Sequence, residues 1–86
     1  MTKKYDKELT YIFLEYKKSL INNDTKFSQR IENILGCIGE KYSKILYGKY
    51  VQNLSMTRIA ITLNHDRSYL YVLLGKAQEA FLQLYE

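Results

Sequence analysis

The lack of proline constrains this chain most: none occurs, and only four glycines lie among its 86 residues. Because proline and glycine are the strongest helix breakers, few positions can interrupt a helix. Apolar side chains recur at steps of three and four from Tyr5 to Leu20, which is the period of one helix face, and the same period returns in later segments. The sequence therefore predicts an all-α fold, a compact bundle of about five helices in a single domain over residues 1–86.

The first part of the chain is expected to supply bracing and supporting helices. A bracing helix is predicted over residues 4–21, because a cluster of Asn and Asp residues follows and forms a turn. Two supporting helices are predicted within residues 28–53. Ser28 is the expected N-cap of the first, since a serine hydroxyl can accept a hydrogen bond from a free amide of the first turn.

Two further helices are predicted in close succession at residues 55–63 and 66–85. Ser55 and Asp66 are their expected N-caps. Asn64 lies between them, and Asn tolerates the left-handed conformation that a tight turn needs. The second of these helices is long and runs nearly to the end of the chain.

The long C-terminal helix carries two apolar stripes, although one is enough to contact a core. The stripe expected to face the core consists of Leu70, Leu73, Ala77, Phe81 and Leu84. Part of the second stripe is expected to pack on the N-terminal helix, and the rest to form a homodimer interface. This second stripe consists of Tyr71, Leu74, Gln78, Leu82 and Tyr85.

Composition excludes several classes of protein. The one cysteine cannot close an internal disulfide, and one cysteine with one histidine cannot complete a structural zinc site, so no metal or cofactor is expected. No apolar run is long enough to span a membrane, and the first residues lack the apolar segment of a signal peptide, so a cytoplasmic location is expected. Cys37 is predicted to be an inert buried thiol and His65 a partly buried turn residue. Without a nucleophile–base pair, a Gly-rich loop or a carboxylate cluster, no catalytic site is predicted.

The spacing of apolar and turn residues over residues 54–77 matches two short helices that cross at a tight turn. Ala60 is the small residue at the crossing, and Leu70 anchors the second helix. With the Ile59-Ala60 and Leu63-Asn64 pairs, residues 28–80 resemble the C-terminal promoter-binding region of bacterial primary sigma factors, region 4. They are also similar to small phage-borne transcriptional regulators with the same pattern.

The chain departs from that family pattern at three positions. Arg58 stands where the family usually has an acidic residue that completes a capping box. Asn64 stands where the family usually has glycine, and His65 where it usually has an apolar residue. Arg58 cannot complete the capping box, but it could reach a phosphate.

The resemblance implies a helix-turn-helix that binds double-stranded DNA, with the start of the last helix in the major groove. Arg67 is the best candidate for a base contact, because arginine can donate two hydrogen bonds to guanine. The residues expected to contact DNA are Arg67, Ser68, Tyr69, Tyr71, Val72, Arg58 and Lys76, with Lys44 and Lys49 on the preceding helix as phosphate contacts.

The charge distribution keeps a second function open. The chain has a net charge of +4, but residues 1–50 hold all of the excess, while residues 51–86 hold three basic and three acidic side chains. Neutralisation of phosphate charge dominates affinity for nucleic acid, and residues 51–86, which contain the predicted DNA-reading helix, have no net charge. The same fold is therefore also compatible with a module that binds protein. Such a module could act on a host machine such as RNA polymerase or a CRISPR nuclease, with Tyr69 and Tyr71 in the interface. A purely structural or oligomerisation protein is a third possibility.

Overall fold

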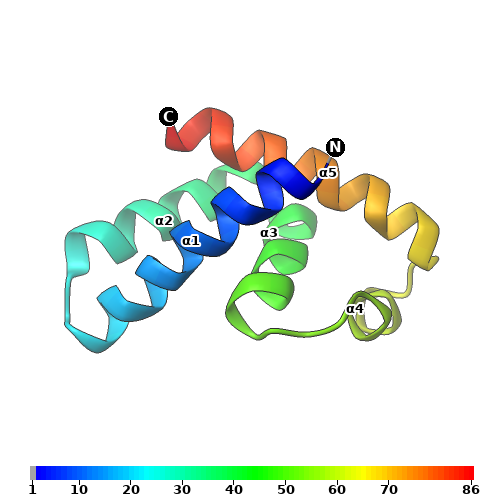
Figure 1. Cartoon of the computed structure of the whole chain (residues 1–86), viewed down its shortest axis with the longest axis horizontal. Helices are drawn as coiled ribbons and strands as arrows, with labels where there is room; N and C mark the ends of the chain where they lie inside the picture. Colours follow the sequence, from blue (N-terminus) through cyan, green and yellow to red (C-terminus); the bar gives the residue numbers. More distant parts are fainter. Residues whose placement is uncertain (1) are drawn as a thin grey trace.

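The computed structural model describes the backbone of residues 2–86 and the side chains from Tyr5 onward, so Met1 of the predicted domain lies outside the described residues. All the regular elements of residues 2–86 are helices and none is a strand, which confirms the all-α prediction. Figure 1 shows their arrangement. The elements are α1 (Thr2–Ile21), α2 (Thr25–Ile38), α3 (Glu40–Leu46), the π-helical turn η1 (Tyr47–Val51), α4 (Met56–Leu63) and α5 (Arg67–Tyr85).

One hydrophobic core joins these helices, and three aromatic rings lie at its centre. The ring of Phe13 on α1 stacks on Tyr50 of η1 with 5.5 Å between centroids, and it lies 5.2 Å from the ring of Phe81 on α5. Both phenylalanines are fully buried. Because aromatic side chains bury large areas, this cluster fixes α1 and η1 against α5.

Helix α2 begins at Thr25, three residues before the predicted N-cap Ser28. Asp24 is the N-cap instead, and its side chain accepts a hydrogen bond from the Phe27 amide at 3.4 Å. The prediction was wrong because the Asn-Asp cluster that ends α1 also supplies the cap of α2. Gly39, with φ of 98°, then separates α2 from α3, and a positive φ of this kind favours glycine.

Helix α3 and η1 form one continuous helical segment that ends at Val51, inside the range 28–53 predicted for the supporting helices. Its last turn is π-helical, which is a rare geometry that often lies near a functional site. Gly48 in this turn is buried, and a Cβ added there would lie 3.4 Å from Cγ1 of Ile59 on α4. The missing side chain therefore lets η1 and α4 approach closely.

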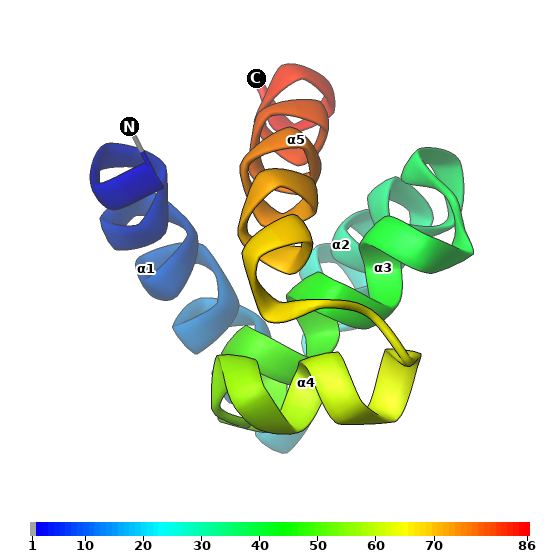
Figure 2. The same cartoon turned by 90° about the vertical axis from the view of Figure 1, so that its right-hand side faces the viewer.

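The predicted ends of α4 and α5 are largely confirmed. The Ser55 hydroxyl accepts a hydrogen bond from the Arg58 amide at 3.1 Å, and Asn64 is left-handed with φ of 59° and ψ of 45°. Asp66 is the N-cap residue of α5, but its side chain makes no capping hydrogen bond. Figure 2 shows α4 lying across the start of α5 after this short turn.

The structure corrects the two predicted stripes of α5. Leu84 of the predicted core stripe is 51% exposed, whereas Leu74, Gln78 and Leu82 of the predicted dimer interface are buried within the chain. The reason is tertiary: α1 and η1 pack against the side of α5 that carries Gln78, whose Nε2 donates a hydrogen bond to the Tyr50 hydroxyl at 2.7 Å.

Cys37 is exposed, which contradicts its predicted burial. The buried face of α2 consists of Ile31, Ile34 and Leu35. Since Cys37 comes six residues after Ile31, it falls off that face and points toward solvent.

Candidate nucleic-acid interface

The first turns of α5 expose every residue that the sequence predicts to face DNA on this segment. Leu70 alone among residues 67–72 is buried, and it anchors the helix to the core. Figure 1 shows this yellow end of α5 projecting beyond α1 and α2. The exposed residues are Arg67, Ser68, Tyr69, Tyr71 and Val72.

Two of these side chains are oriented by aromatic neighbours. The guanidinium carbon of Arg67 lies 5.9 Å from the centre of the Tyr71 ring, one helical turn away. The Tyr69 ring contacts His65 edge to face, with 5.6 Å between centroids. Each contact restricts the orientation of a side chain that remains in contact with solvent.

His65 is half-buried at the turn between α4 and α5, as predicted. It lines a small surface cavity together with Leu63 of α4 and with Glu40, Lys41 and Lys44 of α3. The structure thus brings two lysines from the preceding helix next to the turn that leads into α5. Lys44 was a predicted site residue, and Lys41 can be added to it.

The predicted phosphate contacts Lys44 and Lys49 differ in their exposure and in the groups that they already contact. Lys44 is exposed, and its Nζ lies 3.0 Å from Glu40. Such an exposed pair contributes little to stability, so Lys44 is free to bind other anions. The Nζ of Lys49 lies 3.5 Å from Oδ1 of Asp6 and 5.4 Å from the centre of the Tyr50 ring. Lys49 is therefore engaged with Asp6 of α1 and is less free than Lys44 to contact a phosphate.

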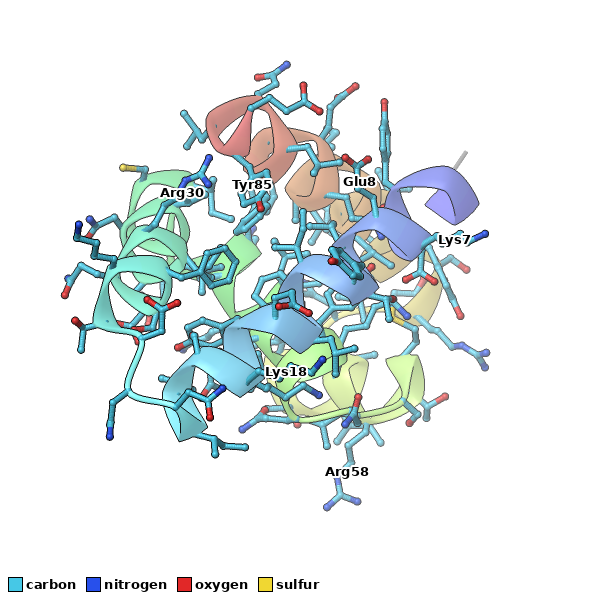
Figure 3. All side chains as sticks on the ribbon, turned by 60° about the vertical axis from the view of Figure 1, so that its left-hand side comes forward. Lys7, Glu8, Lys18, Arg30, Arg58 and Tyr85 are labelled. Atoms are coloured by element: carbon cyan, nitrogen blue, oxygen red, sulfur yellow. The ribbon has the colours of Figure 1, made fainter. Side chains whose placement is uncertain are left out.

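Arg58 and Lys76, the remaining predicted contacts, are exposed on α4 and α5. Arg58 extends away from the body of the molecule (Figure 3). One turn after Arg58 along α4, Ile61 is 72% exposed and was not identified from the sequence. Its position one residue beyond the buried Ala60 places it on the outer face of α4, a signal that the helical period already contains.

The predicted dimer stripe is not a continuous exposed surface. Tyr71 is exposed, but Tyr85 is half-buried and held by Arg30 of α2. The guanidinium of Arg30 lies 4.2 Å from the centre of the Tyr85 ring and also donates a hydrogen bond to the Tyr85 carbonyl, and Figure 3 shows the two residues side by side. With the three residues between Tyr71 and Tyr85 in the core, α5 offers no dimer interface of the predicted kind.

A buried polar cluster behind α5 holds the helix in place. The Tyr50 hydroxyl donates a hydrogen bond to Oδ1 of Asp6 at 2.6 Å and accepts one from Gln78. Burial, reinforced by the hydrogen bond to the Asp6 carboxylate, raises the pKa of Tyr50 well above its ordinary value. The Oε1 of Gln78 is buried without a hydrogen-bond partner among the described residues.

A second tyrosine connects α1 to α2. The Tyr16 hydroxyl donates a hydrogen bond to Oε2 of Glu32 at 2.9 Å. Burial, together with the hydrogen bond to Glu32 and the charge of this carboxylate, raises the pKa of Tyr16 to about 12.

Within residues 2–86, no group of three or more His, Cys, Asp or Glu side chains is placed to hold a metal ion. None of the described helices combines the length and the apolar character that crossing a membrane requires. No protein-family model matches the chain, and comparisons with curated proteins and with solved structures found no significant match.

Proposed function

We propose that this protein binds double-stranded DNA through a helix-turn-helix made of α4 and α5, as a small transcriptional regulator of the phage or mobile-element type. The observation that carries this proposal is the exposed start of α5, where Arg67, Ser68, Tyr69, Tyr71 and Val72 face solvent while α4 lies across the helix. A helix presented in this way fits the major groove with its first turns against the base edges. The proposed role is binding, without catalysis or a cofactor.

The side chains suggest a division of roles. Arg67 would read a guanine through two hydrogen bonds, with the Tyr71 ring restricting its orientation. Val72 would contact a thymine methyl group, and Ser68 a base or a phosphate. Lys76 on α5 and Lys44 beside the turn would position the protein on the phosphate backbone. Arg58, on the outer face of α4, would contact a phosphate farther from the reading helix.

A homodimer belongs to this proposal, because helix-turn-helix regulators commonly bind two-fold symmetric sites. Its interface would lie outside the buried stripe of α5. Sedimentation of the free protein and of its complex with a selected duplex tests this part. A single chain per duplex in the complex would contradict a dimer.

Selection of bound duplexes from a random pool tests the proposed function. Wild-type protein should enrich a short motif that contains guanine, and the same selection with Arg67→Ala should lose the preference at that guanine. Enrichment of no motif by the wild-type protein would contradict sequence-specific binding.

A protein-binding module is the second candidate, acting on a host machine such as RNA polymerase or a CRISPR nuclease. Exposed apolar side chains on both helices support it: Val72 is 53% exposed on the same turns of α5 as the exposed Tyr69 and Tyr71, and Ile61 on α4 is 72% exposed. Large exposed apolar groups of this kind are typical of interaction surfaces.

Affinity purification from host extract, with and without nuclease, separates the two candidates. Partners that survive nuclease treatment and are lost with Tyr71→Ala would favour the protein-binding module. Partners that disappear with nuclease treatment would favour DNA. Tyr11→Ala is the matched control, because Tyr11 is exposed on α1, away from the start of α5.

A further inference from the structure

An apolar groove runs between α4 and the segment formed by α3 and η1. Its volume is about 420 Å³, which falls in the range of about 300–1,000 Å³ that is typical of small-molecule sites. Its lining includes the apolar residues Leu35, Leu54, Ile59 and Leu63 and the polar residues Lys44 and Gln52. No residue of the proposed base-reading set at the start of α5 belongs to this lining, and Lys44 is the one residue that it shares with the proposed phosphate contacts.

The floor and walls of the groove are mostly apolar, and two of its hydroxyl groups are already engaged. The Ser43 hydroxyl donates to the Leu35 carbonyl, and the Thr62 hydroxyl donates to the Arg58 carbonyl at 2.9 Å. The missing side chain of Gly48 lets the backbone of η1 approach Ile59 at the wall of the groove. A ligand in the groove would therefore bury apolar surface along most of its length.

The polar groups that can receive a ligand lie at the rim. Lys44 is exposed and carries a positive charge, and Gln52 is an exposed polar residue of the same lining. None of the described residues that line the groove is acidic. The exposed ion pair of Lys44 with Glu40 is weak enough for another carboxylate to replace Glu40.

We propose that this groove binds a small amphipathic carboxylate: a molecule with an apolar chain or ring that fills the groove and a carboxylate that pairs with Lys44. The apolar lining selects the body of the ligand, and Lys44, the one cationic side chain of the lining, selects its charge when the ligand's carboxylate replaces Glu40. Bound in this way, the ligand contacts α4 and η1 at once and so stabilises the docking of α4 on the rest of the fold.

The test uses three probes that each have a linear chain of ten carbons: decanoate, decanol and decyltrimethylammonium. Affinities are measured by nitrogen–proton correlation NMR on the full chain below the aggregation concentration of each probe. Decanoate should bind most tightly and should shift the amide signals of the lining residues. Equal affinities for the three probes, no saturable binding of decanoate, or shifts located elsewhere would overturn the proposal.

Two pairs of variants locate the site. Lys44→Gln should weaken decanoate about threefold to fivefold without changing decanol, while Lys41→Gln, on the same helix but outside the groove lining, should change neither. Thr62→Trp should block the groove and abolish binding, whereas Thr57→Trp, on an exposed position of α4 outside the lining, should not. Unchanged binding to Lys44→Gln or to Thr62→Trp would overturn the proposal. None of these measurements involves DNA, so their outcome is independent of the proposed function.

Discussion

The hydroxyl of Tyr50 and the carboxylate of Asp6 are joined by a hydrogen bond of 2.6 Å that connects η1 to α1. Gln78 of α5 donates a hydrogen bond to the same hydroxyl at 2.7 Å, and Lys49 approaches the same carboxylate at 3.5 Å. Three elements that are distant in sequence therefore meet at one buried tyrosine. This cluster fixes the buried side of α5 through Gln78, while the first turns of α5 are exposed to solvent.

Removal of the Tyr50 hydroxyl should destabilise the fold. Tyr50→Phe leaves the Nε2 of Gln78 and a partly buried carboxylate oxygen of Asp6 without that partner, which should cost about 1–3 kcal/mol. Urea unfolding followed by circular dichroism measures the change. Tyr11→Phe is the control, since Tyr11 is largely exposed, and its free energy of unfolding should stay within about 0.5 kcal/mol of the wild type. Equal stabilities of the two variants would show that the cluster does not hold the fold.

Alkaline pH should destabilise the protein through Tyr50 and Tyr16. In the unfolded chain both hydroxyls ionise with the ordinary tyrosine pKa of 10.0, whereas the folded state raises the pKa of Tyr16 to about 12 and raises that of Tyr50 as well. Their contribution to stability is therefore complete below pH 10.0 and is lost as pH rises through the folded values.

Each of these tyrosines should lower the free energy of unfolding by at most about 1.4 kcal/mol per pH unit above pH 10. Urea unfolding between about pH 9 and 11 measures the slope. Tyr50→Phe should make the slope shallower, because one titrating group is gone. A slope that is identical in the wild type and in this variant would contradict the assignment.

The buried side of α5 can be tested with two leucines that are two residues apart. Leu82 is 5% exposed and Leu84 is 51% exposed. Leu82→Ala should cost about 2–5 kcal/mol because it opens a cavity in the core, while Leu84→Ala should have a much smaller effect. Thermal unfolding at two protein concentrations measures both. If Leu82→Ala lowered stability at high protein concentration but had no effect on the monomer, the result would instead support the predicted dimer interface.

The turn between α4 and α5 should tolerate only residues that adopt a positive φ. Asn64→Gly should leave stability nearly unchanged, whereas Asn64→Ala should cost about 1–2 kcal/mol because alanine disfavours the left-handed conformation. Chemical denaturation compares the two variants. Asn33→Ala, at an exposed position within α2, serves as the control and should be close to neutral. A larger loss for the glycine variant than for the alanine variant would argue against this geometry.

Local chemistry explains which parts of the fold the sequence predicts. The cap at Ser55 and the left-handed turn at Asn64 depend on neighbouring residues only, and both are confirmed. The cap of α2 was misplaced because Asp24 and Ser28 are both good N-caps in a helical pattern, so residue preference alone does not separate them. Sequence patterns identify such features within a few residues of their true position.

The parts that could not be predicted depend on contacts between distant segments. Two stripes of α5 satisfy the same helical period, and the choice between Leu82 and Leu84 is made by the packing of α1 on one side of α5. Lys49 is likewise engaged with Asp6, a residue of another helix. By contrast, Arg67 and Tyr71 are exposed, as the resemblance to a helix-turn-helix implied, so this part of the candidate site could be predicted.

The most direct test of the proposed function is the affinity for a selected duplex, measured by fluorescence anisotropy as salt increases. We expect log K to fall linearly with log salt concentration, and Arg67→Ala to lose about 1–3 kcal/mol of binding free energy. Lys26→Ala, on the exposed start of α2 at the opposite end of the molecule from the start of α5 (Figure 1), removes the same charge and should change little. Affinity no greater than for an unrelated duplex at low salt, with Arg67→Ala indistinguishable from the wild type, would contradict DNA binding by α5.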